Sequence, residues 1–457
     1  MPPKKKGPMD EPTLKPHAAP KRKEAAPPSR DERSVALKEW FNKKMKNKDG
    51  SYRAQLKSAS EYALPWTYKR LPTGLLSLDT ELRGGFPAGG VSQIIGYRNT
   101  GKTWLYWQII RQLQSFLGKK MKVLLAMTEG RADRTQGRAS GVVVAFNKEE
   151  VERLDRGRIH LGRPPFTPEQ RKWLLAEIGQ IDELHGMAGE DIYDGILAAV
   201  EEDVYHLVVI DSIGMIMSAA EAESESVHDK VYSGSAGVNT QFLHKLSGLL
   251  TLDNEYGKPR ETCVIVINQM RDNVKDPNKE YKNSGGNALE HAKLVDLLFR
   301  PGSQLGENKL LDGKQTWVSH GKEVNWEIKK GKAGMHEGGK GHFTYDFRIK
   351  AFESIPGYDP SLESIFMPGT ADFTADTVAS GVYHGVIEQS GAWFGIPNPE
   401  KSGTYLLRAQ GKEAFARALF EEAVQQAALG NESLFGYIRD QVNMKTGINL
   451  DYNWIDP

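Results

Sequence analysis

The sequence of 457 residues has a single cysteine, Cys263. One cysteine excludes an internal disulfide and a four-cysteine zinc site, and the lack of disulfides favours a reducing compartment. No stretch reaches the ~18 consecutive apolar residues of a membrane-spanning helix, and the N-terminal residues lack the apolar segment of a secretory signal. We therefore expect a soluble, intracellular protein without a membrane partner.

The sequence also has almost no net charge, +1 at pH 7, so its overall charge says nothing about which partners it binds. Lysine and arginine gather instead in residues 1–28, which contain Lys4-Lys5-Lys6 and Lys21-Arg22-Lys23. With few large apolar side chains, this segment cannot bury enough surface to offset its chain entropy. We expect a disordered basic arm, which is compatible with a solvated tail, a loose nucleic-acid tether or a nuclear localisation signal.

The most informative stretch is an eight-residue loop that fits the pattern G-x-x-x-x-G-K-[ST]. Its residues are Gly96, Tyr97, Arg98, Asn99, Thr100, Gly101, Lys102 and Thr103. An apolar run at 91–95 precedes the loop and a helix-like stretch at 104–113 follows it. Backbone N–H groups of such a loop, together with the helix N-terminus, surround a polyphosphate. Lys102 would reach the β- and γ-phosphates and Thr103 would hold Mg²⁺, so the motif predicts a triphosphate site that extends to Trp104.

Other apolar runs, at 122–128, 207–210 and 263–267, have the composition of strands buried on both faces of a parallel sheet. Helical patterns between them predict βαβ units and an α/β fold. The runs are followed by Glu129, Asp211 and Asn268-Gln269 in turn. Ligands of parallel sheets bind at the carboxyl ends of the strands, so these polar side chains are candidates for the site.

Each of these side chains has a role to offer in nucleotide hydrolysis. Asp211 can complete a magnesium site with Thr103, although an aspartate that caps a turn is the alternative. Glu129 can orient a water molecule and accept its proton, although a glutamate after a strand is often merely exposed. Gln269 can sense the γ-phosphate through its amide and leads into a long polar segment, where a change of order would make a switch.

The chain divides into segments of different composition. The predicted boundaries are a basic arm at 1–28, an oligomerisation helix and linker at 29–70, an ATPase core at 71–370 and a C-terminal domain at 371–457. Ser29 and Glu32 form a capping box for the N-terminal helix, whose apolar stripe needs cover from the core or from a second subunit. Residues 137–189 read as an insertion on the sheet, and segments 324–329 and 342–349 as antiparallel edge strands. Two polar stretches, 219–237 and 270–286, read as mobile loops.

These motifs together resemble the RecA family of homologous-recombination proteins, from about residue 71 to 442. The resemblance is carried by 73–79 (TGLLSLD), the phosphate loop, Glu129 with Asp133, 209–212 (VIDS), 267–269 (INQ), 285–289 (GGNAL) and 385–394 (GVIEQSGAWF). It implies a RecA-type P-loop core and a small C-terminal α/β domain. It also implies an ATP-dependent helical filament on single-stranded DNA that exchanges strands with a homologous duplex, with single-strand-binding and loader proteins as further partners.

The resemblance assigns roles that the residues alone do not reveal. Glu129 would activate water, Asp133 would lie near the adenine, and Gln269 would couple the γ-phosphate to DNA. Segments 219–237 and 270–286 correspond to the two DNA loops. The candidate DNA contacts are Arg271, Ser284, Gly285, Gly286 and Asn287. Lys330 and Lys332 match a lysine pair that reaches the nucleotide across the subunit interface, with a solvated turn as the alternative, and residues 34–45 match a helix that docks on the next subunit.

The chain departs from bacterial RecA in the insertion, in the basic arm and in the lack of an acidic C-terminal tail. The family's adenine-stacking aromatic is missing after Asp133, where Arg134-Thr135-Gln136 stands, and either Tyr345 or Phe347 could cover the base. These departures indicate a divergent member, compatible with a phage-encoded one. The expected location is the cytoplasm, at the nucleoid or in an infected bacterial host, rather than the nucleus. A ring-forming helicase and an ATP-stabilised scaffold without essential hydrolysis remain the alternatives.

Overall fold

The computed structural model describes residues 29–48, 50, 52–57, 69–160, 162–224, 234–254, 256–270, 286–311, 313–347 and 370–448. The helices are α1 (Arg30–Met45), α2 (Leu76–Glu81), α3 (Lys102–Leu117), α4 (Arg134–Ala139), α5 (Lys148–His160), α6 (Pro168–Leu174), α7 (Gly189–Glu201), α8 (Ala219–Ala222), α9 (Gly234–Thr251), α10 (Gly286–Ala292), α12 (Phe373–Tyr383), α13 (Lys412–Leu429) and α14 (Leu434–Thr446). Among these described helices, none combines the length and apolarity that crossing a membrane requires.

The strands form one large sheet and two small ones. They are β1 (Arg70–Leu71), β2 (Phe86–Pro87), β3 (Val91–Gly96), β4 (Lys122–Met127), β5 (Gln180–Leu184), β6 (Leu207–Asp211), β7 (Cys263–Gln269), β8 (Lys293–Leu311), β9 (Lys314–Gly331), β10 (Lys340–Asp346), β11 (Thr370–Ala371), β12 (Glu388–Ser390), β13 (Trp393–Pro397) and β14 (Tyr405–Gln410). The large sheet has the order β11-β10-β9-β8-β3-β7-β6-β4-β5. Its strands from β8 to β5 run parallel, and β9, β10 and β11 join antiparallel at one side.

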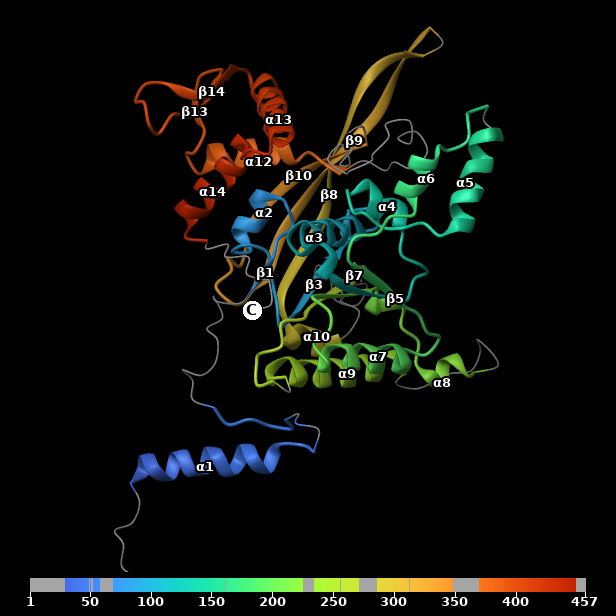
Figure 1. Cartoon of the computed structure of the whole chain (residues 1–457), viewed down its shortest axis with the longest axis vertical. Coiled ribbons are helices and arrows are strands. Elements are labelled where there is room, and N and C mark those ends of the chain that lie inside the picture. The colour runs from blue at the N-terminus through green and yellow to red at the C-terminus, as the bar shows by residue number, and fades with distance from the viewer. Residues whose placement is uncertain are drawn as a thin grey trace, which may run out of the picture.

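The predicted α/β fold with a mostly parallel central sheet is confirmed, and helices cover both faces of that sheet. On one face, α3 buries Trp104, Leu105 and Ile109 against apolar side chains of the strands. On the other, α7, α9 and α10 form a layer (Figure 1), in which Tyr193 and Phe242 stack with ring centroids 3.8 Å apart. Most strand residues between these layers are apolar because neither side of the sheet meets water there, and Ser92 and Gln93 of β3 are buried polar exceptions.

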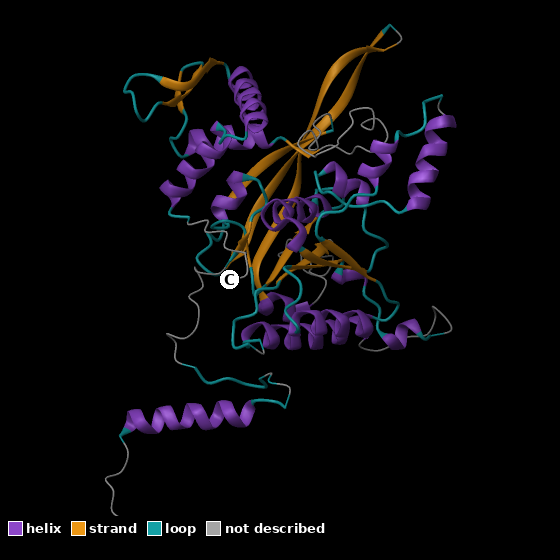
Figure 2. Cartoon of the chain, viewed as in Figure 1, coloured by secondary structure: helices purple, strands orange, loops and turns teal. Residues whose placement is uncertain are grey.

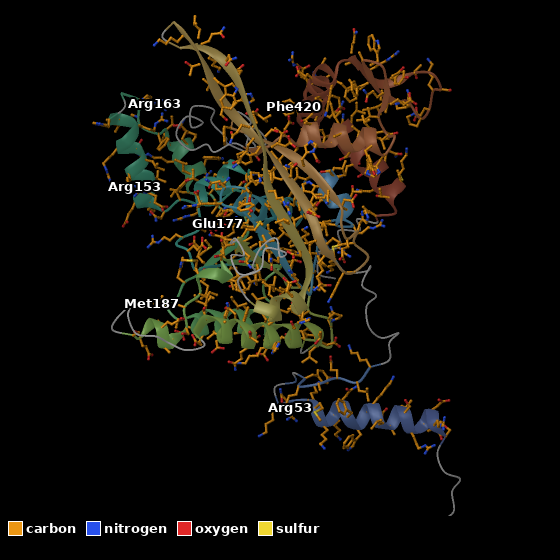
Figure 3. The ribbon with its side chains drawn as sticks, turned by 180° about the vertical axis from the view of Figure 1, so that it is seen from behind. Arg53, Arg153, Arg163, Glu177, Met187 and Phe420 are labelled. Atoms are coloured by element: carbon orange, nitrogen blue, oxygen red, sulfur yellow. The ribbon has the colours of Figure 1, made fainter. Side chains whose placement is uncertain are left out.

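The insertion predicted at 137–189 differs from expectation at its C-terminal end. Helices α4, α5 and α6 have a small core of their own, in which the Arg138 guanidinium lies 4.5 Å from the Phe146 ring and 4.7 Å from the Trp173 ring. Strand β5, however, pairs in parallel with β4 and extends the central sheet. A cavity of about 230 Å³ lies at the joint, lined among others by Arg134 and by Glu177, which Figure 3 labels.

Strands β8 and β9 continue well past the sheet as a two-stranded ribbon (Figure 2). The predicted antiparallel segments lie within the sheet instead, with 324–329 in β9 and 342–346 in the β10 strand that pairs antiparallel with it, while 348–349 are outside the described residues. Gly306 lies under the Trp317 indole of the opposite strand. A Cβ at Gly306 would come within 2.3 Å of that ring, so only glycine allows this cross-strand contact. The indole in turn covers the gap that glycine leaves in the ribbon.

The C-terminal helices and the sheet β12-β13-β14 enclose a separate core around Ile396, Phe415 and Ile438. This part of the chain contacts the main core through α2 and α12. The Ser77 backbone N–H donates to the Asp376 carboxylate at 3.3 Å, and the Ser77 hydroxyl donates to the same carboxylate.

Helix α1 begins as predicted, with a capping box between Ser29 and Glu32, and lies apart from the main body (Figure 1). It buries no residue, and Trp40 is 56% exposed. The chain after it touches the core near the end of α9, where Lys57 forms an ion pair with Asp253.

Candidate nucleotide site

The predicted phosphate loop leaves β3 at Gly96 and enters α3 at Lys102. Two of its residues have left-handed backbone, Asn99 with φ 60° and Gly101 with φ 86°. A Cβ at Gly96 would lie 2.5 Å from the carbonyl oxygen of Phe299, so the start of the loop requires glycine. The loop thus joins the end of a strand to the N-terminus of a helix, the arrangement in which backbone N–H groups bind phosphate.

Lys102 lies inside this loop. Its Nζ donates to the carbonyl oxygens of Gly96 at 2.9 Å and of Tyr97 at 2.6 Å. Burial lowers the pKa of Lys102 to about 8, although Asp211 and Glu129 oppose that shift by attraction. The ammonium is thus held by neutral carbonyls and drawn toward two carboxylates.

Asp211 ends β6 beside the start of α3. Its pKa is raised to about 6, first by burial and then by repulsion from Glu129, while attraction to Lys102 and a hydrogen bond from Thr103 limit the rise. The structure thus brings Thr103 and Asp211 together. A hydroxyl and a carboxylate are hard oxygen donors, the kind that Mg²⁺ prefers.

Glu129 is held by the ends of two neighbouring strands. The Gln269 amide donates to both of its carboxylate oxygens, at 2.9 and 3.0 Å, and the Ser212 hydroxyl donates to one of them. Thr128 fixes Ser212, because the Ser212 N–H donates to its hydroxyl at 2.8 Å. The three polar strand ends therefore converge next to the loop, as their positions in sequence predict.

Lys322 is a site residue that the sequence did not reveal. It stands on β9, more than two hundred residues after the loop, and its ammonium donates to the carbonyl oxygen of Asn99. Burial lowers its pKa, and its Nζ lies 5.8 Å from the centre of the Tyr345 ring. No motif surrounds it in the sequence, since only the pairing of β9 with β8 brings it here.

The predicted base-binding residues lie on α4 and at the end of β10. Asp133 caps α4 and accepts from the N–H groups of Thr135 and Gln136 at 3.0 and 3.1 Å. The Gln136 amide donates to the Tyr345 hydroxyl at 3.2 Å. Tyr345 is buried, whereas Phe347, packed edge-on against it at 5.8 Å, is 42% exposed.

Trp104 has a different place from the one its position after the loop suggests. Its indole is 1% exposed, stacks on Phe343 at 5.0 Å, and donates to the Thr370 hydroxyl at 3.1 Å. Its side chain belongs to the core. Any contact of Trp104 with a nucleotide therefore has to come from the backbone.

Lys330 and Lys332 do not lie at their own protomer's phosphate loop. In the sheet, Gly96 pairs with Phe299, whereas Lys330 pairs with Asp296 and the Lys332 N–H donates to the Leu294 carbonyl. At about 3.3 Å per residue, the lysines lie roughly 10 to 17 Å from the level of the phosphate loop, toward the end of the sheet where the parallel strands begin.

Most of the predicted DNA contacts are outside the described residues. Arg271, Ser284 and Gly285 belong to this group, while Gly286 and Asn287 open α10. In the other predicted loop, 219–222 form α8 and 234–237 begin α9.

Comparisons with known proteins identify a matching domain family and several related proteins. A family model described as an AAA domain matches residues 61–238. Protein RecA of Chlorobaculum parvum is 25% identical over 356 residues, which are 78% of this chain and 79% of that protein. Protein RecA of Nitratidesulfovibrio vulgaris strain DP4 is 28% identical over 357 residues, or 77% of this chain and 76% of that protein. The crystal structure of the RadB recombinase is 21% identical, covering 60% of this chain and 94% of that one, but at a TM-score of 0.35 it adds nothing to the fold described above.

Proposed function

We propose that this chain, which is a divergent member of the RecA family of P-loop ATPases, is a DNA recombinase. It would polymerise on single-stranded DNA in the presence of ATP, pair that strand with a homologous duplex, and exchange the strands. The observation that carries the proposal is the convergence of Lys102, Asp211, Glu129 and Gln269 at one edge of the sheet. These residues combine a phosphate site at Lys102 with a carboxylate, Glu129, that can activate water. Gln269 is also the residue before the second predicted DNA segment.

ATP hydrolysis follows from this arrangement. Lys102 neutralises charge on the β- and γ-phosphates. Thr103 and Asp211 would hold Mg²⁺, which would supply positive charge to offset the negative charge that develops on the phosphate during hydrolysis. Glu129 orients the attacking water and takes its proton, while the loop N–H groups hold the phosphates in place.

Gln269 gives the site a way to sense the γ-phosphate. Its amide is bonded to both oxygens of Glu129. If the same amide turns to a γ-phosphate oxygen, Glu129 is released for water and the start of segment 270–286 shifts with Gln269. Hydrolysis would return the amide to Glu129, so the nucleotide state and the DNA segment change together.

The position of Lys330 and Lys332 supports assembly of the chain with itself. Because the pair lies near the end of the sheet where the parallel strands begin, away from its own phosphate loop, it can contact a nucleotide only on a neighbouring copy. The exposed apolar residues of α1 likewise fit a second copy as the surface that covers them. ATP would then lie between protomers, facing Glu129 and Gln269 of one protomer and contacted by Lys330 and Lys332 of the next.

The remaining site residues take their roles from the same proposal. Phe347 is the more exposed of the two candidate rings, so we assign it to the adenine, with Asp133 beside the base. Arg271, Ser284, Gly285, Gly286 and Asn287 would contact the DNA backbone, which suits binding without sequence preference. Single-strand-binding and loader proteins would act with the chain in the cytoplasm, at the nucleoid or in an infected bacterial host.

The affinity for Mg-ATP should be greatest between about pH 6 and pH 8. Below the raised pKa of Asp211, about 6, metal binding must displace a proton, and above the lowered pKa of Lys102, about 8, phosphate binding must take one up. Affinity should therefore fall about tenfold per pH unit on either side. Calorimetric titration from pH 5 to 9 measures it. Glu129→Gln should move the acid limb to lower pH, because Glu129 raises the pKa of Asp211, and a flat profile would contradict the assignment.

Electron microscopy with single-stranded DNA and a slowly hydrolysed ATP analogue tests the proposed assembly. We expect helical filaments with the analogue and none with ADP. Closed rings around the strand would favour the helicase instead. Strand exchange should then occur with a homologous duplex and not with a heterologous one of equal length.

A further inference from the structure

Lys293 is a buried lysine that the proposed mechanism does not use. It is the first residue of β8, and its side chain is 0% exposed. Its ammonium donates to the Glu290 carboxylate at 2.7 Å and to the Asp296 carboxylate at 2.5 Å. Because a buried charge without partners is strongly destabilising, these two bonds tie the last turn of α10 to β8.

Lys330 rests on the same turn of α10. It pairs with Asp296 across β8 and β9, and its ammonium donates to the backbone carbonyl oxygen of Glu290. That carbonyl is among the last four of its helix, which lack a partner inside the helix. The direction of the Lys330 side chain is therefore set by where α10 ends.

The neighbouring charges further restrict the direction of the Lys330 side chain. Burial and the like charges of Lys332 and Lys293 lower the pKa of Lys330, while Glu290 and Asp296 attract its ammonium. Since lysine has a long and flexible side chain, it takes a single direction only where such neighbours fix it. Lys332 is exposed and acts on Lys330 through its charge, but among the described residues no hydrogen bond or ion pair joins its side chain to Lys293, Glu290 or Asp296.

We propose that Lys293, held between Glu290 and Asp296, is a positioning residue for Lys330. It fixes the helix end that receives the Lys330 ammonium, and thereby the direction in which Lys330 meets a nucleotide on the neighbouring protomer. The inference rests on the proposed function, in which Lys330 acts across the subunit interface. Because α10 begins where the second predicted DNA segment ends, one helix would link DNA and the cross-subunit lysine.

A double-mutant cycle on DNA-stimulated ATP hydrolysis tests this role. Loss of one charge-assisted hydrogen bond corresponds to a factor of about 10 to 100, so Lys330→Ala should lower kcat by that order. Lys293→Met should lower kcat by a similar factor, with less than about a twofold change in KM for ATP, because positioning acts on the reacting state. The double variant should be no slower than Lys330→Ala alone.

Lys332→Ala is the matched control, because its exposed ammonium is outside the Lys293 ion pairs. Its effect and that of Lys293→Met should multiply. If the effects of Lys293→Met and Lys330→Ala also multiply, or if Lys293→Met keeps the wild-type kcat, the positioning role is overturned.

Two further measurements separate positioning from misfolding and from failure of the proposed function. Lys293→Met leaves Asp296 buried without its cation, so Lys293→Met/Asp296→Asn should restore the melting temperature while kcat stays low. Recovery of kcat together with the melting temperature would overturn the inference. If DNA does not change the rate of ATP hydrolysis by the wild-type protein, the proposed function itself is refuted. A fully active Lys330→Ala variant would refute only the role of this lysine.

Discussion

Glu129→Gln should lower kcat for ATP hydrolysis by about 10² to 10⁴, the usual contribution of a general base. The amide has the size of the carboxylate but cannot accept a proton from water. It also presents an N–H₂ group where Gln269 and Ser212 now donate, so at least one of these bonds is lost. Single-turnover hydrolysis measures the rate, and equilibrium titration should find ATP affinity nearly unchanged, since Lys102 and the loop remain.

The consequence for DNA distinguishes the proposed recombinase from a scaffold. With hydrolysis blocked, Glu129→Gln should form ATP-locked complexes on single-stranded DNA that do not turn over. A scaffold would pair DNA as well as the wild type does. Glu183→Gln is the control. Glu183 lies on β5, next to the strand β4 that precedes Glu129, and its carboxylate accepts from the Ala132 N–H rather than from Gln269. Hydrolysis at the wild-type rate in Glu129→Gln would assign the base to another residue.

Lys102→Ala should abolish the difference that ATP makes to DNA binding. The ammonium is the charged donor enclosed by the phosphate loop, and a hydrogen bond to a charged group contributes about 1.5 to 3 kcal/mol, or roughly 10- to 150-fold in affinity. At ATP concentrations that saturate the wild type, the variant should bind labelled single-stranded DNA only as weakly as with ADP. Fluorescence anisotropy with ATP, with ADP and without nucleotide gives the comparison.

Lys119→Ala is a suitable control for Lys102→Ala, because Lys119 is an exposed lysine just beyond the other end of α3. The Lys102→Ala protomer still carries Lys330, so mixing it with Lys330→Ala protomers should restore part of the hydrolysis. No recovery in the mixture would count against action across the interface. Equal DNA binding with ATP, with ADP and in Lys102→Ala would refute the coupling of nucleotide to DNA altogether.

The sequence predicted those parts of the fold that local patterns determine. The strands β3, β4, β6 and β7 lie between two layers of helices, so most of their residues are apolar and the runs are easily recognised, even with Ser92 and Gln93 inside β3. The polar residues after them had to meet, since parallel strands end at one edge. Strand β5 was not predicted because, at the edge of the sheet, Gln180–Leu184 is partly exposed and has three polar residues among five, without the regular alternation that indicates a strand.

Long-range pairing decided what the sequence could not reveal. Lys322 reaches the phosphate loop only through the register of β9 on β8, and Gln136 meets Tyr345 across more than two hundred residues. Trp104 was placed in the site because it follows the motif, but α3 turns its side chain into the core. A motif fixes the backbone of a loop more firmly than the direction of the side chains beside it.

Helix α1 also has a consequence for the strength of any complex that it joins. A helix of 16 residues with none buried is marginally stable in water, so part of its binding energy would be spent on ordering it. The reciprocal bonds of Ser29 and Glu32 order the first turn in advance, and substituting a capping residue typically costs about 1 kcal/mol. Ser29 and Glu32 thus lower the cost of ordering α1, although neither side chain needs to touch the partner. A weaker cap would raise the protein concentration at which the complexes dissociate.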